Sequence, residues 1–179
     1  MSPIRIGIIG AGRIGKVHAE SIAYRIPAAK ITAVCDVNLT AAHDLANRLS
    51  IPVVSDNYKE IVNRPDVDAV LVCSSTDTHA DVIKAAAAAR KHIFTEKPID
   101  LSLARIDEVL RAVEQAGVKF QVGFNRRFDP TFARVRKAIQ GGEIGETHLL
   151  HIISRDPAPP PAEYVAVSGG IFLDMMIHD

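Results

Sequence analysis

The sequence has no excess of charge of either sign. Its 179 residues include 21 lysines and arginines and 21 aspartates and glutamates, so the formal net charge is zero. This balance argues against a broad basic surface that neutralises nucleic-acid phosphates or binds anionic membranes. No apolar run reaches the roughly 18 residues of a membrane span, and the first residues lack the pattern of a signal peptide. We expect a cytoplasmic protein that binds neither nucleic acid nor membrane.

Cysteine is scarce as well. Cys35 and Cys73 each end an apolar run, so we expect buried, reduced thiols rather than a disulfide. The sequence contains no His-Glu-x-x-His motif and no cysteine cluster, and we predict no metal site. Apolar residues, by contrast, make up 47% of the chain, which is ample for a packed core.

Short apolar runs alternate with helix-like segments up to Gly123. The runs are continuous, which is typical of strands buried on both faces of a sheet. Their alternation with helices favours an α/β fold, in which right-handed crossovers join a parallel, doubly wound sheet covered on both sides. We predict strands at 4–9, 31–35, 52–55, 69–73, 92–95 and 119–122. We predict helices at 14–26, 41–49, 58–63, 81–90 and 103–116.

The pattern changes after Gly123. We predict, in order, a basic amphipathic helix, a turn, a strand, a proline-rich loop and a second helix, at 130–140, 141–145, 147–153, 157–161 and 169–179. About 55 residues are too few for an independent domain of this kind. We therefore expect one complete domain over 1–123, the incomplete beginning of another over 124–179, and a chain that is the N-terminal part of a longer protein.

A Gly-x-Gly-x-x-Gly motif lies between the first predicted strand and helix. Gly10 permits a tight turn, Gly12 lets the backbone approach a pyrophosphate, and Gly15 lets the helix pack closely on the strand. Asp36 ends the second predicted strand, about 20 residues further on, where a carboxylate accepts hydrogen bonds from a ribose diol. The alternative is an ordinary glycine turn with a capping aspartate. Strand, glycines, helix and acid in register favour a Rossmann dinucleotide-binding domain.

The residues assigned to this cofactor site are Gly10, Gly12, Arg13, Ile14, Gly15 and Asp36. Arg13 is able to receive the 2′-phosphate of NADP, but Asp36 occupies the ribose position itself and repels that phosphate. We therefore expect NAD as the cofactor.

Polar residues also follow the fourth and fifth predicted strands, where an open parallel sheet binds its ligands. Lys97 is expected to face the cofactor crevice and to stabilise an alkoxide; the alternative is a surface lysine. Ser74, Thr76 and His79 are expected to touch the cofactor, although the same residue types favour helix capping. Glu96 is assigned to the cofactor site with them.

Two further candidates lie near the end of the chain. If the segment is helical, Asp174 and His178 are i,i+4 neighbours, and a carboxylate beside an imidazole makes a general base. The alternatives are a surface pair or a fragment of a metal site. Of the remaining histidines, we expect His18 and His43 on exposed helix faces and read two more, His148 and His151, as structural residues of a strand.

The motifs together resemble one family over the whole chain. The glycine motif, the Ser/Thr-rich turn ending in His79, Glu96-Lys97-Pro98 and Gly-Gly-x-x-x-Asp-x-x-x-His-Asp look like the glucose–fructose oxidoreductase / inositol dehydrogenase / rhizopine catabolism family. Segments 123–130 and 154–161 resemble its inositol 2-dehydrogenases in particular.

The resemblance implies an NAD-dependent dehydrogenase acting on a CH–OH group, with myo-inositol as the cyclic polyol substrate. It implies Lys97, Asp174 and His178 around the substrate, and it adds a set of substrate-binding residues, Asn125, Arg127 and Arg155. It also implies a C-terminal α/β domain, beginning within 124–179, that carries substrate residues and the contacts of a homo-oligomer. The alternatives are another sugar or polyol as substrate, or a non-catalytic NAD-binding fragment. We expect the 179-residue chain to bind NAD without measurable inositol oxidation.

Overall fold

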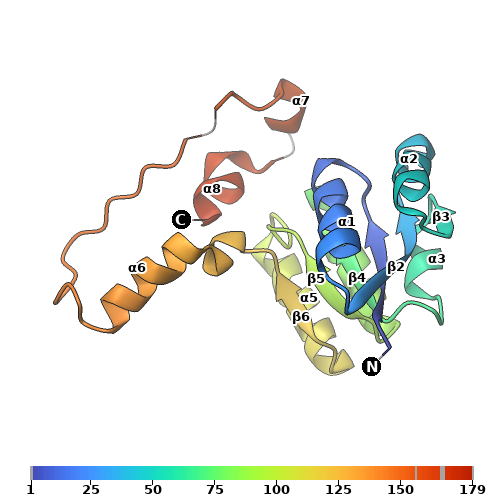
Figure 1. Ribbon diagram of the computed structural model, residues 1–179, viewed down its shortest axis with the longest axis horizontal. Coiled ribbons are helices and arrows are strands. Elements are labelled where there is room, and N and C mark those ends of the chain that lie inside the picture. The colour runs from blue at the N-terminus through green and yellow to red at the C-terminus, as the bar shows by residue number, and fades with distance from the viewer. Residues whose placement is uncertain (1, 156, 166–167, 179) are drawn as a thin grey trace. The chain divides into compact units, whose positions relative to one another are not determined.

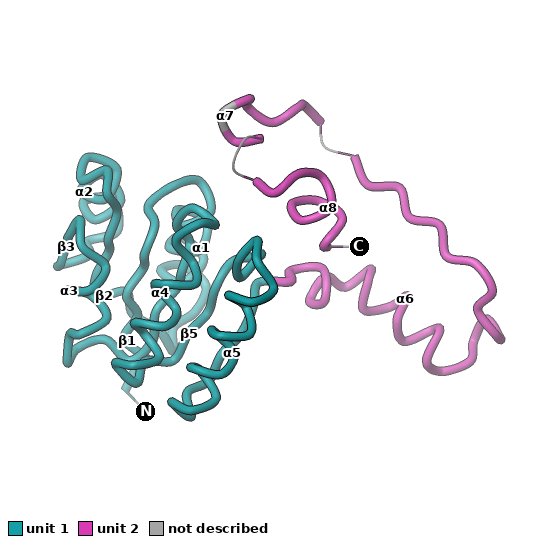
Figure 2. The backbone as a smooth tube through the Cα atoms, turned by 180° about the vertical axis from the view of Figure 1, so that it is seen from behind, with its two compact units in different colours: residues 1–123 teal, residues 124–179 magenta. Residues whose placement is uncertain are grey.

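The protein consists of two compact units. The computed structural model describes residues 2–155, 157–165 and 168–178. The chain divides into Met1–Gly123 and Phe124–Asp179, coloured teal and magenta in Figure 2. No helix in the described part of the chain is long and apolar enough to cross a membrane.

The first unit is a six-stranded, fully parallel sheet in the order β3-β2-β1-β4-β5-β6 (Figure 1). Its strands are β1 (Ile4–Ile9), β2 (Ala29–Cys35), β3 (Val53–Ser55), β4 (Ala69–Val72), β5 (His92–Thr95) and β6 (Phe120–Val122). Its helices are α1 (Arg13–Arg25), α2 (Leu39–Leu49), α3 (Tyr58–Val62), α4 (Thr76–Ala88) and α5 (Leu103–Ala116). The predicted α/β class and doubly wound parallel sheet are confirmed.

Each face of the sheet has its own core. Ile8 of β1 is buried with residues of α1 and α2, whereas its neighbour Ile9 is buried with residues of α3, α4 and α5. Successive side chains of a strand point to opposite faces. Because both faces of β1 are buried, both neighbours are apolar and the strand is a continuous apolar run. The pattern therefore places α1 and α2 on one face and α3 to α5 on the other.

The order of the strands reverses beside β1. The chain moves outward from β1 through β2 to β3, and then returns to place β4 on the other side of β1. In such sheets the ligand crevice lies beyond the carboxyl ends of the strands at this reversal. The loops after β1, β4 and β5, which contain the glycine motif, Ser74 and Lys97, all leave the sheet at that edge.

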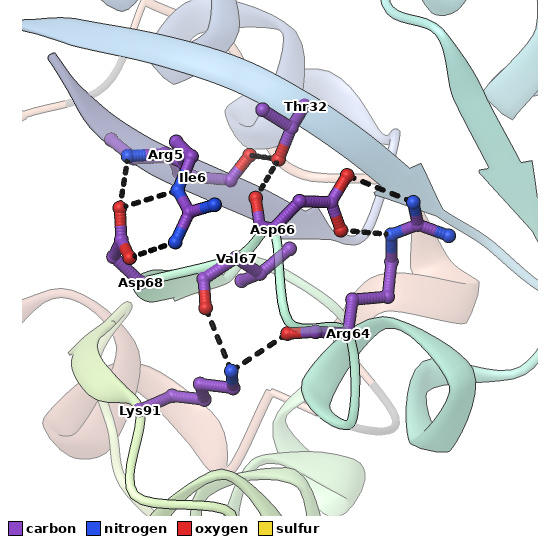
Figure 3. Close-up of polar contacts among 8 residues, drawn as sticks. All are labelled: Arg5, Ile6, Thr32, Arg64, Asp66, Val67, Asp68 and Lys91. Atoms are coloured by element: carbon purple, nitrogen blue, oxygen red, sulfur yellow. Dashed lines mark hydrogen bonds and ion pairs between the residues drawn. The ribbon is translucent and has the colours of Figure 1, made fainter. Parts of the chain in front are cut away.

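A polar network lies at the amino ends of the strands, opposite the glycine motif (Figure 3). The Arg5 side chain donates from Nε and Nη2 to the Asp68 carboxylate, at 2.9 and 2.6 Å. Lys91 donates from Nζ to the backbone carbonyls of Arg64 and Val67, both at 2.7 Å. These contacts hold the segment between α3 and β4. This segment lies at the amino ends of the strands, whereas the glycine motif follows the carboxyl end of β1.

Asp68 should contribute stability that is lost in acid. Its pKa is lowered from 3.8 to about 2, first by the side-chain hydrogen bond from Arg5 and then by the Arg5 backbone N–H. A group whose pKa is lower in the folded than in the unfolded protein stabilises the fold above its ordinary pKa. We expect Asp68→Asn to cost up to about 1 kcal/mol at pH 7, the range of exposed ion pairs.

The measurement is the free energy of unfolding in urea between pH 7 and pH 2. The difference between the unaltered protein and Asp68→Asn should shrink as the pH falls from about 4 to about 2. Asp107→Asn, at an exposed position of α5, serves as the control. A difference that stays constant down to pH 2 would contradict this role of Asp68.

The second unit contains short helical elements. They are η1 (Asn125–Phe128), α6 (Pro130–Gln140), α7 (Ala162–Val165), α8 (Gly170–Asp174) and η2 (Met176–His178), where η denotes a 3₁₀-helix. The predicted helix at 130–140 is confirmed as α6. Asp129 caps it, accepting hydrogen bonds from the N–H groups of Thr131 and Phe132, and Pro130 occupies its first turn, where no N–H donor is needed.

Three local predictions in the second unit are wrong. The strand at 147–153 is absent: this segment is exposed and irregular, because a strand needs a partner and the described residues of the second unit contain none. His148 and His151 therefore lie on an exposed segment and not on a strand. The single helix over 169–179 is instead α8 followed by η2, so Asp174 and His178 belong to different elements; residue 179 lies outside the described residues. Five residues without a side-chain cap are too short to propagate a helix.

The helix predicted to start at residue 81 begins five residues earlier, at Thr76. Its first turn is closed by Thr78, whose N–H and hydroxyl both donate to the Ser75 carbonyl. Polar residues of this kind favour helix starts, and Asp77 complements the positive end of the helix dipole. The apolar pattern begins only after that turn, which is why it placed the start too late.

Candidate active site

The three glycines of the motif differ in what requires them. A Cβ at Gly10, where φ is +106°, would collide with the backbone of Cys73 and Ser74, and a Cβ at Gly15 would collide with the Gly10 carbonyl. A Cβ at Gly12 would meet no atom of the described residues within 4 Å. Packing of the chain itself therefore requires the first and third glycines. The second glycine leaves open space beside the N-terminus of α1, and the N-terminus of a helix favours the binding of an anion.

Asp36 lies directly against this loop. Its Oδ2 accepts a hydrogen bond from the Ala11 N–H at 2.6 Å, and its Oδ1 accepts one from the Asn38 N–H at 2.8 Å. A carboxylate has about four acceptor positions, so two remain for a ribose diol. The open space at Gly12 and this carboxylate together fit a dinucleotide.

The loop after β4 is tied to the loop after β5 by a buried histidine. His79, in the first turns of α4, is only 1% exposed. Its Nδ1 lies 2.8 Å from the Pro98 carbonyl oxygen and its Nε2 lies 3.0 Å from the Ser74 carbonyl oxygen. Both nitrogens thus face the protein's own backbone. Of the other two predicted residues here, Ser74 shares a 2.7 Å hydrogen bond with the Thr78 hydroxyl, and Thr76 is half-buried at the start of α4.

Lys97 follows β5 at the same edge of the sheet and is half-buried. The peptide bond between Lys97 and Pro98 is cis. Its neighbour Glu96 is also half-buried, and the Glu96 Oε1 lies 2.7 Å from Nε2 of His18. Burial acts to raise the pKa of Glu96, but the hydrogen bond and electrostatic interaction with His18, together with the backbone hydrogen bond and charge of Lys97, outweigh it, and that pKa is lowered. Glu96 is therefore an anion at neutral pH.

The exposed position predicted for His18 is wrong. Its side chain is 25% exposed and packs edge-on against Phe94, with ring centroids 5.2 Å apart. His43, on α2, is exposed as predicted. His18 differs from His43 because it meets Phe94 of β5 and Glu96, the residue that follows β5.

Both cysteines are free and buried, as predicted. Burial raises the pKa of the Cys35 and Cys73 thiols to about 12 in each case, with smaller contributions from nearby carboxylates. Neither thiol ionises at neutral pH, so neither is a nucleophile. The described residues also contain no group of three or more His, Cys, Asp or Glu side chains able to hold a metal ion.

The second unit contains the remaining predicted site residues. The Asp174 carboxylate accepts a 2.7 Å hydrogen bond from the Tyr164 hydroxyl. His178 and Arg127 line the same hollow of about 600 Å³, which is bounded by aromatic and basic side chains. The Cζ atom of the Arg127 guanidinium lies 5.9 Å from the Phe124 ring centroid. The two other predicted substrate residues, Asn125 and Arg155, are exposed.

Comparison with known proteins agrees with this geometry. Residues 4–124 match the model of an oxidoreductase family with an NAD-binding Rossmann fold, and residues 132–179 match the GFO/IDH/MocA C-terminal domain. The first unit is therefore the NAD-binding domain of an oxidoreductase. The chain belongs to the GFO/IDH/MocA family.

Named relatives in this family act on inositols. The chain is 47% identical to the myo-inositol 2-dehydrogenase of Thermotoga maritima and 48% identical to the inositol 2-dehydrogenase of Rhizobium meliloti, in each case over 98% of the chain and 52% of the relative. The structure of scyllo-inositol dehydrogenase from Lactobacillus casei, with bound NAD(H) and scyllo-inositol, matches with a TM-score of 0.86 and 34% identity, over 99% of this chain and 54% of that one. The chain thus spans about half the length of the relatives it matches.

Proposed function

We propose that the protein oxidises a secondary hydroxyl group of an inositol to a ketone, with NAD as the cofactor. The observation that supports this most strongly is the meeting of three groups at one edge of the sheet: the open space at Gly12, the Asp36 carboxylate and Lys97. The names of the relatives support an inositol as the substrate.

In this proposal the glycine loop and Asp36 hold the pyrophosphate and the adenosine ribose, and Ser74 and Thr76 border the same crevice. Bound NAD supplies the hydride acceptor. The Lys97 ammonium donates a hydrogen bond to the reacting oxygen and stabilises its negative charge as it develops. His178 takes the hydroxyl proton, and Asp174, itself held by the Tyr164 hydroxyl, favours the imidazolium that results.

The residues assigned to substrate binding are Asn125, Arg127 and Arg155. Arg127 lines the same hollow as His178, which supports its place beside the general base. We further propose that residues 124–179 begin a substrate and oligomerisation domain and that the protein is a homo-oligomer.

The test is NADH formation by the protein expressed from its whole gene. The 179-residue chain alone is measured beside it, and for that chain we expect NAD binding without measurable oxidation of inositol. From the whole protein we expect turnover with myo-inositol or scyllo-inositol and none with the open-chain polyol sorbitol; the ratio of the two inositol rates identifies the preferred isomer. NAD binding without oxidation of either inositol would favour the non-catalytic alternative. Faster oxidation of another sugar or polyol would assign a different substrate.

Cofactor selectivity provides a separate prediction. We expect NAD to bind at least about 10-fold more tightly than NADP, because one charge repulsion of about 1.4 kcal/mol suffices for that ratio. Asp36→Asn retains an acceptor for the Ala11 N–H and removes the charge, so the ratio should fall about 10-fold. Calorimetric titration with both cofactors measures it, and Asp44→Asn on the exposed face of α2 is the control. Equal or tighter NADP binding by the unaltered protein would contradict the role of Asp36.

A further inference from the structure

The short segment Glu96–Lys97–Pro98 is held by histidines from two different helices. His18 of α1 contacts the residue before Lys97, with 2.7 Å between its Nε2 and the Glu96 Oε1. His79 of α4 contacts the residue after Lys97, with 2.8 Å between its Nδ1 and the Pro98 carbonyl oxygen. Because α1 and α4 belong to the cores on opposite faces of the sheet, the segment is contacted by one histidine from each face.

The contacts of His79 require hydrogen-bond donation from the ring. Both of its partners, the carbonyl oxygens of Pro98 and Ser74, are acceptors only. A ring N–H directed at either of them joins α4 to a loop that leaves the carboxyl edge of the sheet. An apolar side chain of similar size would fill the same buried space but would leave these carbonyls without that donor, which is costly at a buried position.

The contact of His18 confines the Glu96 carboxylate. The Glu96 backbone N–H is already bound to the Val72 carbonyl at 2.9 Å, which continues the pairing of β5 with β4. Gly123 lies close to the carboxylate, because a Cβ at this position would approach the Glu96 Oε1 to 3.1 Å. The His18 ring, itself packed on Phe94, supplies a further contact to this carboxylate.

We propose that His18 and His79 are positioning residues that set where the Lys97 ammonium lies. They connect Lys97 to the helix that starts in the glycine loop and to the loop that contains Ser74, so the three loops at this edge form one rigid frame. The inference rests on the proposed role of Lys97. Its consequence is that removing either histidine misplaces a group that touches the reacting oxygen, although neither histidine touches it.

The first experiment measures turnover of inositol by His18→Leu and His79→Leu. We expect kcat to fall about 10-fold to 100-fold, as for a displacement of about 1 Å at a reacting group, while the dissociation constant of NAD changes by a smaller factor than kcat. His18→Gln and His79→Gln, whose amide N–H groups are able to donate to the same acceptors, should recover part of the loss. Val82→Ala is the matched control, because Val82 is buried on α4 and makes none of these contacts.

The second experiment does not depend on the reaction. The protein is labelled with lysine carrying ¹³C at Cε, and the Lys97 signal is identified as the one missing in Lys97→Arg. We expect this signal to shift or broaden in both leucine variants and to stay in place in Val82→Ala. If the unaltered protein oxidises no inositol, the proposed function fails, and the Lys97 signal alone then decides the positioning role.

The proposal is overturned if the leucine variants match Val82→Ala in kcat and in the Lys97 signal, after all are compared at equal loss of thermal stability. In that case the histidines serve only the folding of the first unit. Recovery by the glutamine variants supports positioning, because a merely space-filling role would be served as well by leucine.

Discussion

Gly12→Val should weaken NAD binding by more than about 100-fold and leave the first unit folded. The valine side chain would occupy the space beside the start of α1, where the backbone must approach the pyrophosphate. No atom of the described residues lies within 4 Å of a Cβ at this position, so we expect the fold to accept a side chain there. Calorimetric titration gives the dissociation constant, and circular dichroism gives the thermal midpoint.

Gly15→Val is the matched control for this prediction. Its Cβ would collide with the Gly10 carbonyl oxygen, so the α1 helix and the glycine loop have to separate. We expect Gly15→Val to lower the thermal midpoint and Gly12→Val to leave it nearly unchanged. Native NAD affinity in Gly12→Val would show that the cofactor does not pass over this loop.

His178→Ala should reduce inositol turnover by about 10²-fold to 10⁴-fold, the range expected for a lost general base. Lys97→Met should reduce it by about 10²-fold to 10³-fold, the range expected when one donor to a developing negative charge is removed. Lys97→Met removes the donor to the reacting oxygen, and because that donor serves the reacting end of the site, NAD affinity should stay within about threefold. His178→Ala removes the acceptor of the hydroxyl proton. The measurement is NADH formation at saturating cofactor.

Two exposed residues provide controls of the same type. Lys30→Met lies at the amino end of β2, and His43→Ala lies on the exposed side of α2. Both should retain normal turnover. If Lys97→Met or His178→Ala oxidises inositol at the rate of the unaltered protein, that residue has been assigned the wrong role.

Most of the first unit was predictable because its signals are local. Burial on both faces makes β1 and β4 continuous apolar runs, and Gly117 ends α5 with a positive φ of 64°, as a glycine at a helix end favours. The second unit was less predictable. Its helix α6 has a local cap in Asp129, whereas a strand at 147–153 requires a partner that no local pattern supplies.

The site also has a part that the sequence predicted and a part that it did not. The sequence placed the glycine motif, Asp36 and Lys97 at the carboxyl ends of strands, and the structure has them at that edge. It did not find the contacts of His18 and His79. The prediction placed His18 and His43 alike on exposed helix faces, whereas the contacts that half-bury His18 come from Phe94 and Glu96, outside its own helix.

By itself the sequence determined the strands of the first unit, the glycine turn and the acid beside it, because steric limits on glycine and the burial of both faces of a strand act within a few residues. The partner of His18 was decided only by the tertiary structure. Glu96 lies 78 residues further along the chain, and the two meet because β4 returns beside β1 and brings β5 with it. Contacts over such separations depend on the strand order of the whole sheet, and no short segment contains that information.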